Sequence, residues 1–140
     1  MSRKKFFFAL LGGLFSLLLT SCKCTQEQMG GLVIINDTPA EGTLISSLLP
    51  SFSWHSDSCD PSYYAVSVNE NGSSLYSEYD QTSDNDTSFD WVAPPLEPGK
   101  EYAWHVRPFL IDPGYMAGHN SEETIFYTGP VCSCESLVSP

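Results

Sequence analysis

The sequence predicts an all-β fold, a seven-stranded antiparallel β-sandwich. Short segments in which apolar and polar residues alternate recur along the chain, and such alternation places one face of a strand in a core and the other in water. Turn residues separate these segments at short intervals. After residue 21, no segment has apolar residues at helical spacing over three turns. Seven short strands separated by turns are typical of a sandwich.

The first three predicted strands lie in the N-terminal half. Residues 32–35 form an apolar run that closes at the turn residue Pro39. Residues 52–54 place a serine between two aromatic residues. Residues 64–68 also alternate, and Asn71-Gly72 behind them is a hairpin turn signal.

The other four predicted strands follow. Residues 75–79 are a short strand that precedes the polar loop 80–86. Residues 87–92 alternate at two aromatic residues and stop before a pair of prolines, which donate no ladder hydrogen bond. Residues 102–106 show the clearest period-2 pattern, and residues 124–128 close the domain.

The inward-facing positions of these strands define the expected core. About 100 residues bury enough surface to sustain one. The predicted core residues are Phe52, Trp54, Tyr64, Val66, Val68, Phe89, Leu96, Tyr102, Trp104, Val106 and Phe126.

The charge is strongly acidic. Three of the six basic residues lie in the first 21 residues, whereas all 17 acidic residues follow them, so residues 22–140 carry a formal net charge of −14. Such a surface repels nucleic acid and anionic lipid headgroups, because both are bound mainly through cations. The acids are dispersed among many aromatic residues, which indicates a folded chain.

A secretory signal is predicted at the N-terminus. Residues 3–5 are basic, and the apolar run 6–19 is shorter than the roughly 20 residues of a membrane-spanning helix. The run ends in Leu19-Thr20-Ser21-Cys22, which resembles the lipobox of bacterial lipoproteins. The resemblance implies that the Cys22 thiol takes a diacylglycerol, that residues 1–21 are removed, and that the new amino terminus is acylated. Two or three acyl chains hold a protein firmly on a membrane.

The expected organisation follows from this signal. Residues 22–32 are polar and glycine-ended, and we interpret them as a lipidated tether. Residues 33–129 form the sandwich, and residues 130–140 a C-terminal tail. The protein is expected to be exported and lipid-anchored to the bacterial cell envelope. Lys23 favours the outer over the inner membrane, since in enterobacterial lipoproteins an aspartate there favours inner-membrane retention.

One segment carries a resemblance to a domain family. The sequence Leu96-Glu97-Pro98-Gly99-Lys100-Glu101-Tyr102 resembles the L-x-P-G-x-x-Y signature of fibronectin type III domains, which have an immunoglobulin-like sandwich fold. The resemblance implies that Leu96 fills the core and that Pro98-Gly99 makes a turn. It also implies that the Tyr102 hydroxyl bonds to the nearby backbone in a tyrosine corner.

Other segments agree with this family in order and spacing. Residues 50–54 are similar to its second strand with a buried tryptophan, residues 64–68 to its third, and residues 126–128 to its F-x-T ending. The resemblance covers about residues 33–129. The chain departs from the family at Pro94-Pro95 and has no Arg-Gly-Asp, so integrin binding is not carried over. The family lacks catalytic residues, so the resemblance implies an interaction module.

Four cysteines besides Cys22 suggest disulfides, because an exported protein meets oxidising conditions. Three pairings are open. The family resemblance places the N-terminus and the Cys59 loop at one end, which implies Cys24–Cys59 and leaves Cys132 and Cys134 to pair with each other or with a partner. The rival pairing joins the tail to Cys24 and the remaining tail cysteine to Cys59.

Catalytic motifs are missing from the sequence. His55, His105 and His119 are scattered, and no H-E-x-x-H, G-x-S-x-G or phosphate loop accompanies them. We expect no enzyme activity and no cofactor.

The aspartates in and beside the loop 80–86 are a calcium candidate, and Asp57 and Asp60 flank Cys59. Calcium binds six to eight oxygens, several of them from carboxylates on loops. The loop lacks the glycine and distal glutamate of an EF-hand, so we prefer to interpret it as a solvated loop that binds no metal. Its carboxylates are Asp80, Asp84, Asp86 and Asp90.

Exposed aromatic residues are the candidate ligand-binding positions. If Tyr64 points inward, Tyr63 and Tyr79 point outward, and Tyr115 and His119 lie in the loop before the last strand. Such side chains stack on sugar rings or anchor protein partners.

The sequence thus favours a non-enzymatic, membrane-anchored envelope lipoprotein that presents a fibronectin type III-like module to an unidentified protein or glycan. One alternative is a structural accessory subunit of a periplasmic or secretion complex, which pairs a sheet edge with a partner strand. Another is a small thiol or metal protein that uses Cys132 and Cys134.

Overall fold

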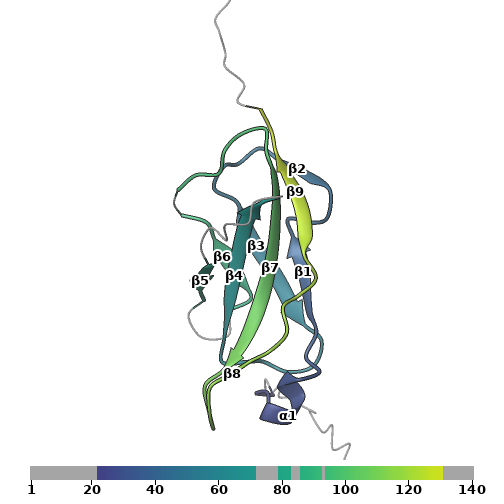
Figure 1. The fold of residues 1–140 in the computed structure, drawn as a ribbon, viewed down its shortest axis with the longest axis vertical. Helices are drawn as coiled ribbons and strands as arrows, with labels where there is room; N and C mark the ends of the chain where they lie inside the picture. Colours follow the sequence, from purple (N-terminus) through teal and green to yellow (C-terminus); the bar gives the residue numbers. More distant parts are fainter. Residues whose placement is uncertain (1–21, 72–78, 83–85, 93, 131–140) are drawn as a thin grey trace, which may run out of the picture.

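A computed structural model describes residues 22–71, 79–82, 86–92 and 94–130, which form two β-sheets packed face to face (Figure 1). The expected all-β sandwich is confirmed. One short helix, α1 (Gln26–Met29), lies at the lower end in Figure 1. The strands are β1 (Ile34–Thr38), β2 (Thr43–Ile45), β3 (Ser51–Ser56), β4 (Tyr63–Glu70), β5 (Tyr79–Gln81), β6 (Ser88–Asp90), β7 (Glu101–Leu110), β8 (Met116–Ala117) and β9 (Thr124–Thr128).

The two sheets differ in size. The smaller sheet has the order β1-β3-β6, and the larger has the order β2-β9-β7-β4-β5, with β8 paired to β7. The alternation pattern does not predict β2 or β8, because strands of three and two residues are too short to show a period. The predicted strand at residues 75–79 lies outside the described residues except for Tyr79, where β5 begins.

One strand pair contradicts the fully antiparallel prediction. β2 runs parallel to β9, whereas the other pairs of named strands are antiparallel. The reason is backbone hydrogen bonding along the edge of β9 that β7 leaves free. The Gly42 N–H donates to the Ile125 carbonyl and the Gly129 N–H donates to the Ile45 carbonyl, each at 2.8 Å.

The core lies between the sheets and is largely aromatic. The predicted core residues are buried, except that Phe89 is half-buried and packs against the cluster. Phe52 and Trp104, from opposite sheets, have ring centroids 5.0 Å apart, and Trp54 and Tyr64 have centroids 5.4 Å apart. Such ring pairs contribute about 0.5–1.5 kcal/mol beyond their area. The two inner faces are therefore locked together by rings.

The segment before β7 has the geometry that the family resemblance implies. Leu96 is buried, and Gly99 has a φ of 69°, a conformation that favours glycine. The Tyr102 hydroxyl accepts a hydrogen bond from the Glu97 N–H at 2.9 Å. This bond spans only five residues and fixes the start of β7 relative to the preceding turn.

The expected tether, residues 22–32, contains the capped helix α1 and packs against the sandwich. Thr25 caps α1, since its hydroxyl accepts from the Gln28 N–H while the Gln28 side chain accepts from the Thr25 N–H. Met29 and Leu32 are buried in the core. The segment is polar on average, but its few apolar side chains face inward, and these attach it to the sandwich.

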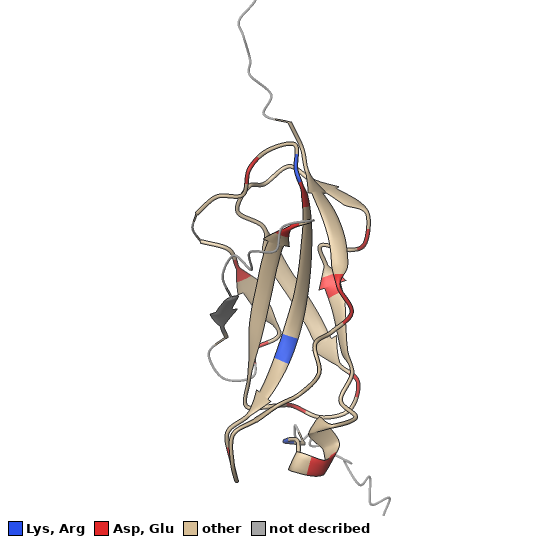
Figure 2. Cartoon of the chain, in the orientation of Figure 1, with Lys and Arg blue, Asp and Glu red and all other residues tan. Residues whose placement is uncertain are grey.

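The acidic side chains are spread over the fold. Figure 2 shows Asp and Glu in loops and at strand ends over the whole length of the molecule, with few Lys and Arg among them. The dispersion agrees with a solvated acidic surface and concentrates no charge at one point.

Candidate functional site

The N-terminal end of the described chain is attached to the loop that carries Cys59. The Cys22 carbonyl accepts from the Asp60 N–H, and the Cys24 N–H donates to the Asp60 carbonyl, both at 2.9 Å. Lys23 and Asp60 thereby form a short parallel bridge. Cys22 itself is exposed, and its thiol is not in a disulfide. The residue that would carry the lipid is therefore held at the surface of the fold.

A disulfide secures this attachment. Cys24 and Cys59 are bonded across 35 residues of sequence, and both are buried. The pairing implied by the family resemblance is therefore confirmed. Cys132 and Cys134 lie outside the described residues, so their pairing stays a prediction.

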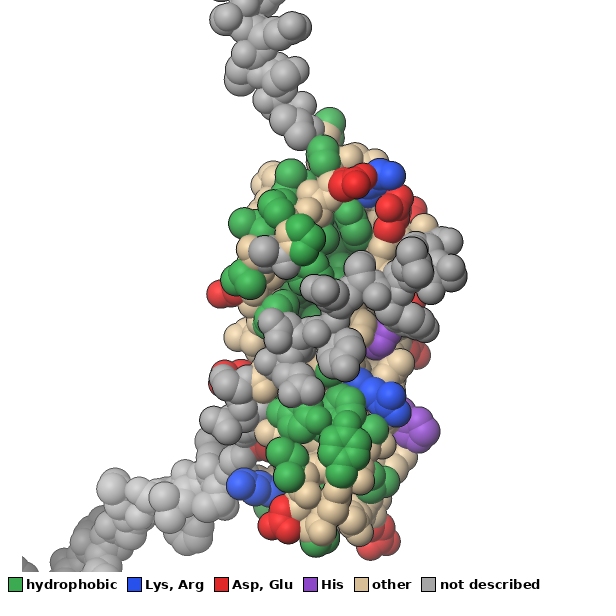
Figure 3. All heavy atoms as spheres, turned by 60° about the vertical axis from the view of Figure 1, so that its left-hand side comes forward, with side chains coloured by type: hydrophobic (Ala, Val, Ile, Leu, Met, Phe, Trp, Pro, Cys, Tyr) green, Lys and Arg blue, Asp and Glu red, His purple; other side chains and the backbone are tan. Residues whose placement is uncertain are grey.

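Three aromatic rings gather on the outer face of the larger sheet, near the N-terminal end; Tyr115 is exposed, whereas Tyr63 and Phe109 are half-buried. We call Tyr63, Phe109, Tyr115 and the neighbouring Arg107 the aromatic surface. Figure 3 shows hydrophobic side chains gathered at the lower end of this face, with a basic side chain at their border. Tyr63 and Phe109 are directly opposite each other on β4 and β7, and Tyr115 precedes β8. The structure thus brings two of the predicted binding residues together.

The rings of the aromatic surface form a row. The Tyr63 and Phe109 rings are stacked, with centroids 4.9 Å apart and planes at 5°. Tyr115 continues the row, with its centroid 5.7 Å from that of Phe109 and 71% of its surface exposed. The stacking covers one face of each of the first two rings.

Arg107 adds a cation to this surface. Its guanidinium carbon lies 5.7 Å from the Phe109 ring centroid, within the range of a cation–π contact, and its Nε donates to the Gly118 carbonyl at 3.1 Å. Lys100, by contrast, pairs with Glu70 at 2.9 Å. Arg107 is exposed and makes no ion pair with another residue in the described part of the chain.

The other two predicted ligand-binding residues lie apart from the aromatic surface or are not described. Tyr79 begins β5, where its backbone is opposite Ser67, but its side chain lies outside the described residues. His119 is exposed and lines a groove along β1. The structure therefore does not gather all four candidates into one site.

The groove runs between β1 and the segment before β9. It has a volume of about 530 Å³, and the side chains of Val33 and Ile35 beside it are 52% and 44% exposed. β1 is an edge strand of the smaller sheet. The Asn36 amide closes one part of the groove by donating to the Glu122 carbonyl at 3.0 Å. An unpaired edge beside apolar side chains is the geometry that strand addition uses.

The calcium candidates are only partly described. Asp84 and the side chain of Asp80 lie outside the described residues, Asp86 is exposed, and Asp90 accepts from the Ser51 hydroxyl at 2.6 Å. Within the described ranges, no group of three or more His, Cys, Asp or Glu side chains is placed to hold a metal.

The histidines lie apart from one another. His55 contacts Asp37 at 2.8 Å on the outer face of the smaller sheet. His105 lies on β7, opposite Ser67 of β4, and burial lowers the pKa of its imidazole, against the opposing effect of the Glu123 carboxylate. His105 is therefore neutral at physiological pH.

The comparisons with known proteins support the fold alone. No protein-family model matches the chain, and no curated protein matches its sequence. A solved structure described as "Myokine structure" is similar, with a TM-score of 0.50 and 19% identity over 68% of this chain and 96% of that chain. Among the described residues, no helix has the length and apolar character to cross a membrane.

Sequence reasoning did not find Phe109 or Arg107. Phe109 lies beyond residues 102–106, where the predicted strand ends, and β7 continues to Leu110. The sequence did contain a pattern that predicts the longer strand. The inward positions of the alternation continue at Val106, Pro108 and Leu110, which leaves Arg107 and Phe109 outward. The strand was predicted to end before Pro108, because proline usually stops a strand.

Proposed function

We propose that this protein is a non-enzymatic lipoprotein of the bacterial cell envelope that presents one fibronectin type III-like domain to a protein partner. The signal sequence that ends at Cys22 supports the lipid anchor and export. The strand order β1-β3-β6 against β9-β7-β4 supports the family assignment, as does the hydrogen bond from the Glu97 N–H to the Tyr102 hydroxyl.

The observation that carries the binding role is the aromatic surface with its exposed cation, Arg107. Tyrosine and arginine are the residue types that dominate binding energy at protein interfaces. The stacking of Tyr63 and Phe109 covers one face of each ring, which leaves fewer free faces for a sugar ring and favours a protein over a glycan. Arg107 favours a partner with a carboxylate at the contact.

The first test is the location of the domain. We expect wild-type protein to fractionate with the envelope and the Cys22→Ala variant to be released in soluble form. Protease treatment of intact cells then separates a surface domain, which is digested, from a periplasmic one, which is protected until the envelope is permeabilised. Unchanged membrane association of Cys22→Ala would refute the lipoprotein.

The second test addresses the aromatic surface. Cross-linking in intact cells identifies the partner, and its affinity is then measured for Tyr63→Ala and Arg107→Ala. Each change should weaken binding at least about thirty-fold, the effect of a hot-spot residue. Tyr127→Ala is the control, since Tyr127 is an exposed tyrosine of the larger sheet that lies outside the aromatic surface. Equal affinities for the three variants would exclude this surface.

The groove beside β1 favours a second candidate function. A structural accessory subunit would add a partner strand to the free edge of β1, next to Val33 and Ile35. Ile35→Asp would then abolish copurification of the partner, while the aromatic surface variants would not. Retention of the partner by Ile35→Asp would rule this function out.

A further inference from the structure

The attachment of Cys22 to the fold limits how far the domain stands from the membrane. Lys23 is the only residue between Cys22 and the disulfide-bonded Cys24, and one residue spans at most about 3.6 Å. The Cys22 carbonyl is itself hydrogen-bonded to the Asp60 N–H. A lipid on Cys22 therefore leaves no slack between the bilayer and this end of the domain.

A second loop lies at the same end. The Ser62 hydroxyl, two residues after Asp60, accepts from the Ile111 N–H at 3.0 Å. On the other side, a Cβ built on Gly114 would lie 3.5 Å from the Gln26 side-chain nitrogen of α1. Figure 1 shows α1 and the turn before β8 together at the lower end of the molecule. Residues 22–29, 57–62 and 111–115 thus form one surface, which we call the end face.

The end face exposes two side chains that suit a membrane interface. Ile111 is 60% exposed and Tyr115 is 71% exposed. An aliphatic side chain gains free energy by leaving water, and tyrosine is enriched where headgroups meet acyl chains. Tyr115 also belongs to the aromatic surface, where its ring contacts Phe109, so it is common to the two surfaces.

We propose that the end face rests on the bilayer, with Ile111 and Tyr115 in the interfacial layer beside the lipid of Cys22. This inference depends on the proposed lipidation. The domain then stands with its long axis away from the membrane, and the β2–β9 end, at the opposite end in Figure 1, is farthest from it. The aromatic surface lies near the bilayer, so its protein partner must itself reach the membrane surface.

The charge of the end face selects the kind of lipid. Glu27, Asp57 and Asp112 are exposed there, against the single cation of Lys23. Anionic headgroups would be repelled over a Debye length of about 8–10 Å. A zwitterionic bilayer therefore fits this surface. In low salt, added anionic lipid should move Ile111 and Tyr115 out of the interface.

The experiment uses the full lipidated protein in phosphatidylcholine vesicles with brominated acyl chains, which quench tryptophan fluorescence on contact. Ile111→Trp and Tyr115→Trp place reporters in the proposed contact. Leu44→Trp is the matched control, because Leu44 is 67% exposed on β2 at the opposite end. The three native tryptophans are buried and contribute the same background to each variant.

We expect the added emission of Ile111→Trp and Tyr115→Trp to shift to the blue and be lost in brominated vesicles, while that of Leu44→Trp is unchanged. Vesicle flotation and intact mass report the lipid separately. If the lipid is present but neither reporter is quenched, or all three are quenched alike, the seating is wrong and the lipoprotein stands. If no lipid is attached, the proposed function and this inference fail together.

Discussion

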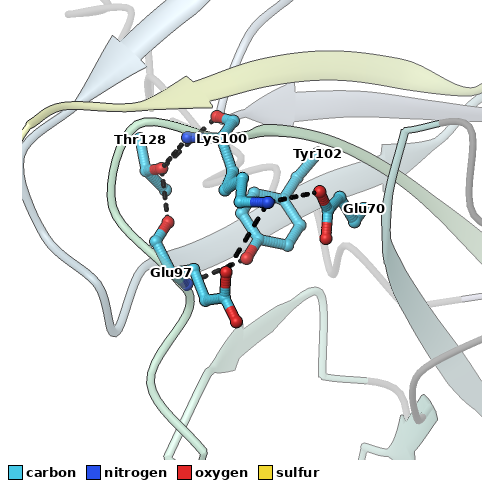
Figure 4. A network of polar contacts seen from close by, with 5 residues as sticks. All are labelled: Glu70, Glu97, Lys100, Tyr102 and Thr128. Carbon is cyan, nitrogen blue, oxygen red and sulfur yellow. Dashed lines mark hydrogen bonds and ion pairs between the residues drawn. The ribbon is translucent and has the colours of Figure 1, made fainter.

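The two ends of the sandwich are closed by different chemistry. At the N-terminal end, the Cys24–Cys59 disulfide and the buried Met29 side chain hold the chain in place. At the opposite end, the closure is polar. Figure 4 shows this network, which consists of Glu70, Glu97, Lys100, Tyr102 and Thr128.

The polar end depends on short backbone and side-chain bonds. Thr128, which is buried, donates to the Glu97 carbonyl at 2.6 Å and accepts from the Lys100 N–H at 2.9 Å. The Lys100 ammonium completes it with an ion pair to Glu70 at 2.9 Å. A net hydrogen bond contributes about 1 kcal/mol and an exposed ion pair less. The covalently closed end is thus the stronger one, and it is the end that a lipid on Cys22 would pull.

The largest expected effect is loss of the disulfide. The double variant Cys24→Ser/Cys59→Ser should lose about 4 kcal/mol of unfolding free energy, the chain-entropy value for a 35-residue loop. Urea unfolding followed by tryptophan fluorescence measures it. Cys22→Ser is the control, because its exposed thiol is not in a disulfide, and it should change stability by less than about 0.5 kcal/mol. A similar loss of unfolding free energy in Cys22→Ser would contradict the conclusion that the disulfide makes this end the stronger one.

Next comes the apolar contact at the same end. Met29→Ala should lower the unfolding free energy by about 3 kcal/mol, because it leaves a cavity beneath α1. Leu44→Ala, at an exposed position on the opposite end, should have little effect. Thermal unfolding of the two variants provides the measurement. If Met29→Ala were neutral, α1 would not be part of the folded unit.

The polar end should respond more weakly. Thr128→Val keeps the shape of the side chain but leaves the Glu97 carbonyl and the Lys100 N–H without this partner, at a cost of about 2 kcal/mol. Chemical unfolding again reports the loss, with Thr43→Val as a half-buried control on β2. Combined with Met29→Ala, the two losses should add, since distant sites are independent. Strong coupling would mean that the two ends do not behave separately.

The smallest expected effect is the loss of stability when Lys100, at the polar end, loses its proton at alkaline pH. The hydrogen bond to Glu70 and the Glu70 and Glu97 carboxylates raise the pKa of Lys100 above its ordinary value of 10.5. Stability from this pair is present below pH 10.5 and is lost as the pH rises through the folded-state pKa. The alkaline decline in unfolding free energy should be smaller in Lys100→Gln than in the wild type. It should be the same in proteins with and without the disulfide. Burial also raises the pKa of Tyr64. Its ionisation at alkaline pH therefore lowers the stability of the wild type and of Lys100→Gln alike.

Local pattern in the sequence determined the strands that form the core. Alternation at residues 64–68 and 102–106 dictated which side chains face inward, because successive side chains of a strand point to opposite sides. The turn at Gly99 and the Tyr102 hydrogen bond were equally local, since they join residues at most five apart. The cysteine pairing was predictable from the family resemblance, which placed both partners at one end.

The tertiary structure decided what depends on neighbours distant in sequence. A count of polar residues predicted a tether at residues 22–32, yet burial of Met29 and the disulfide of Cys24 attach this segment to the fold. The aromatic surface likewise required β4 and β7 to place Tyr63 opposite Phe109. The physical reason is the same in both cases. Alternation reports only whether a side chain faces inward, whereas the partner that it meets is set by how the strands and loops pack.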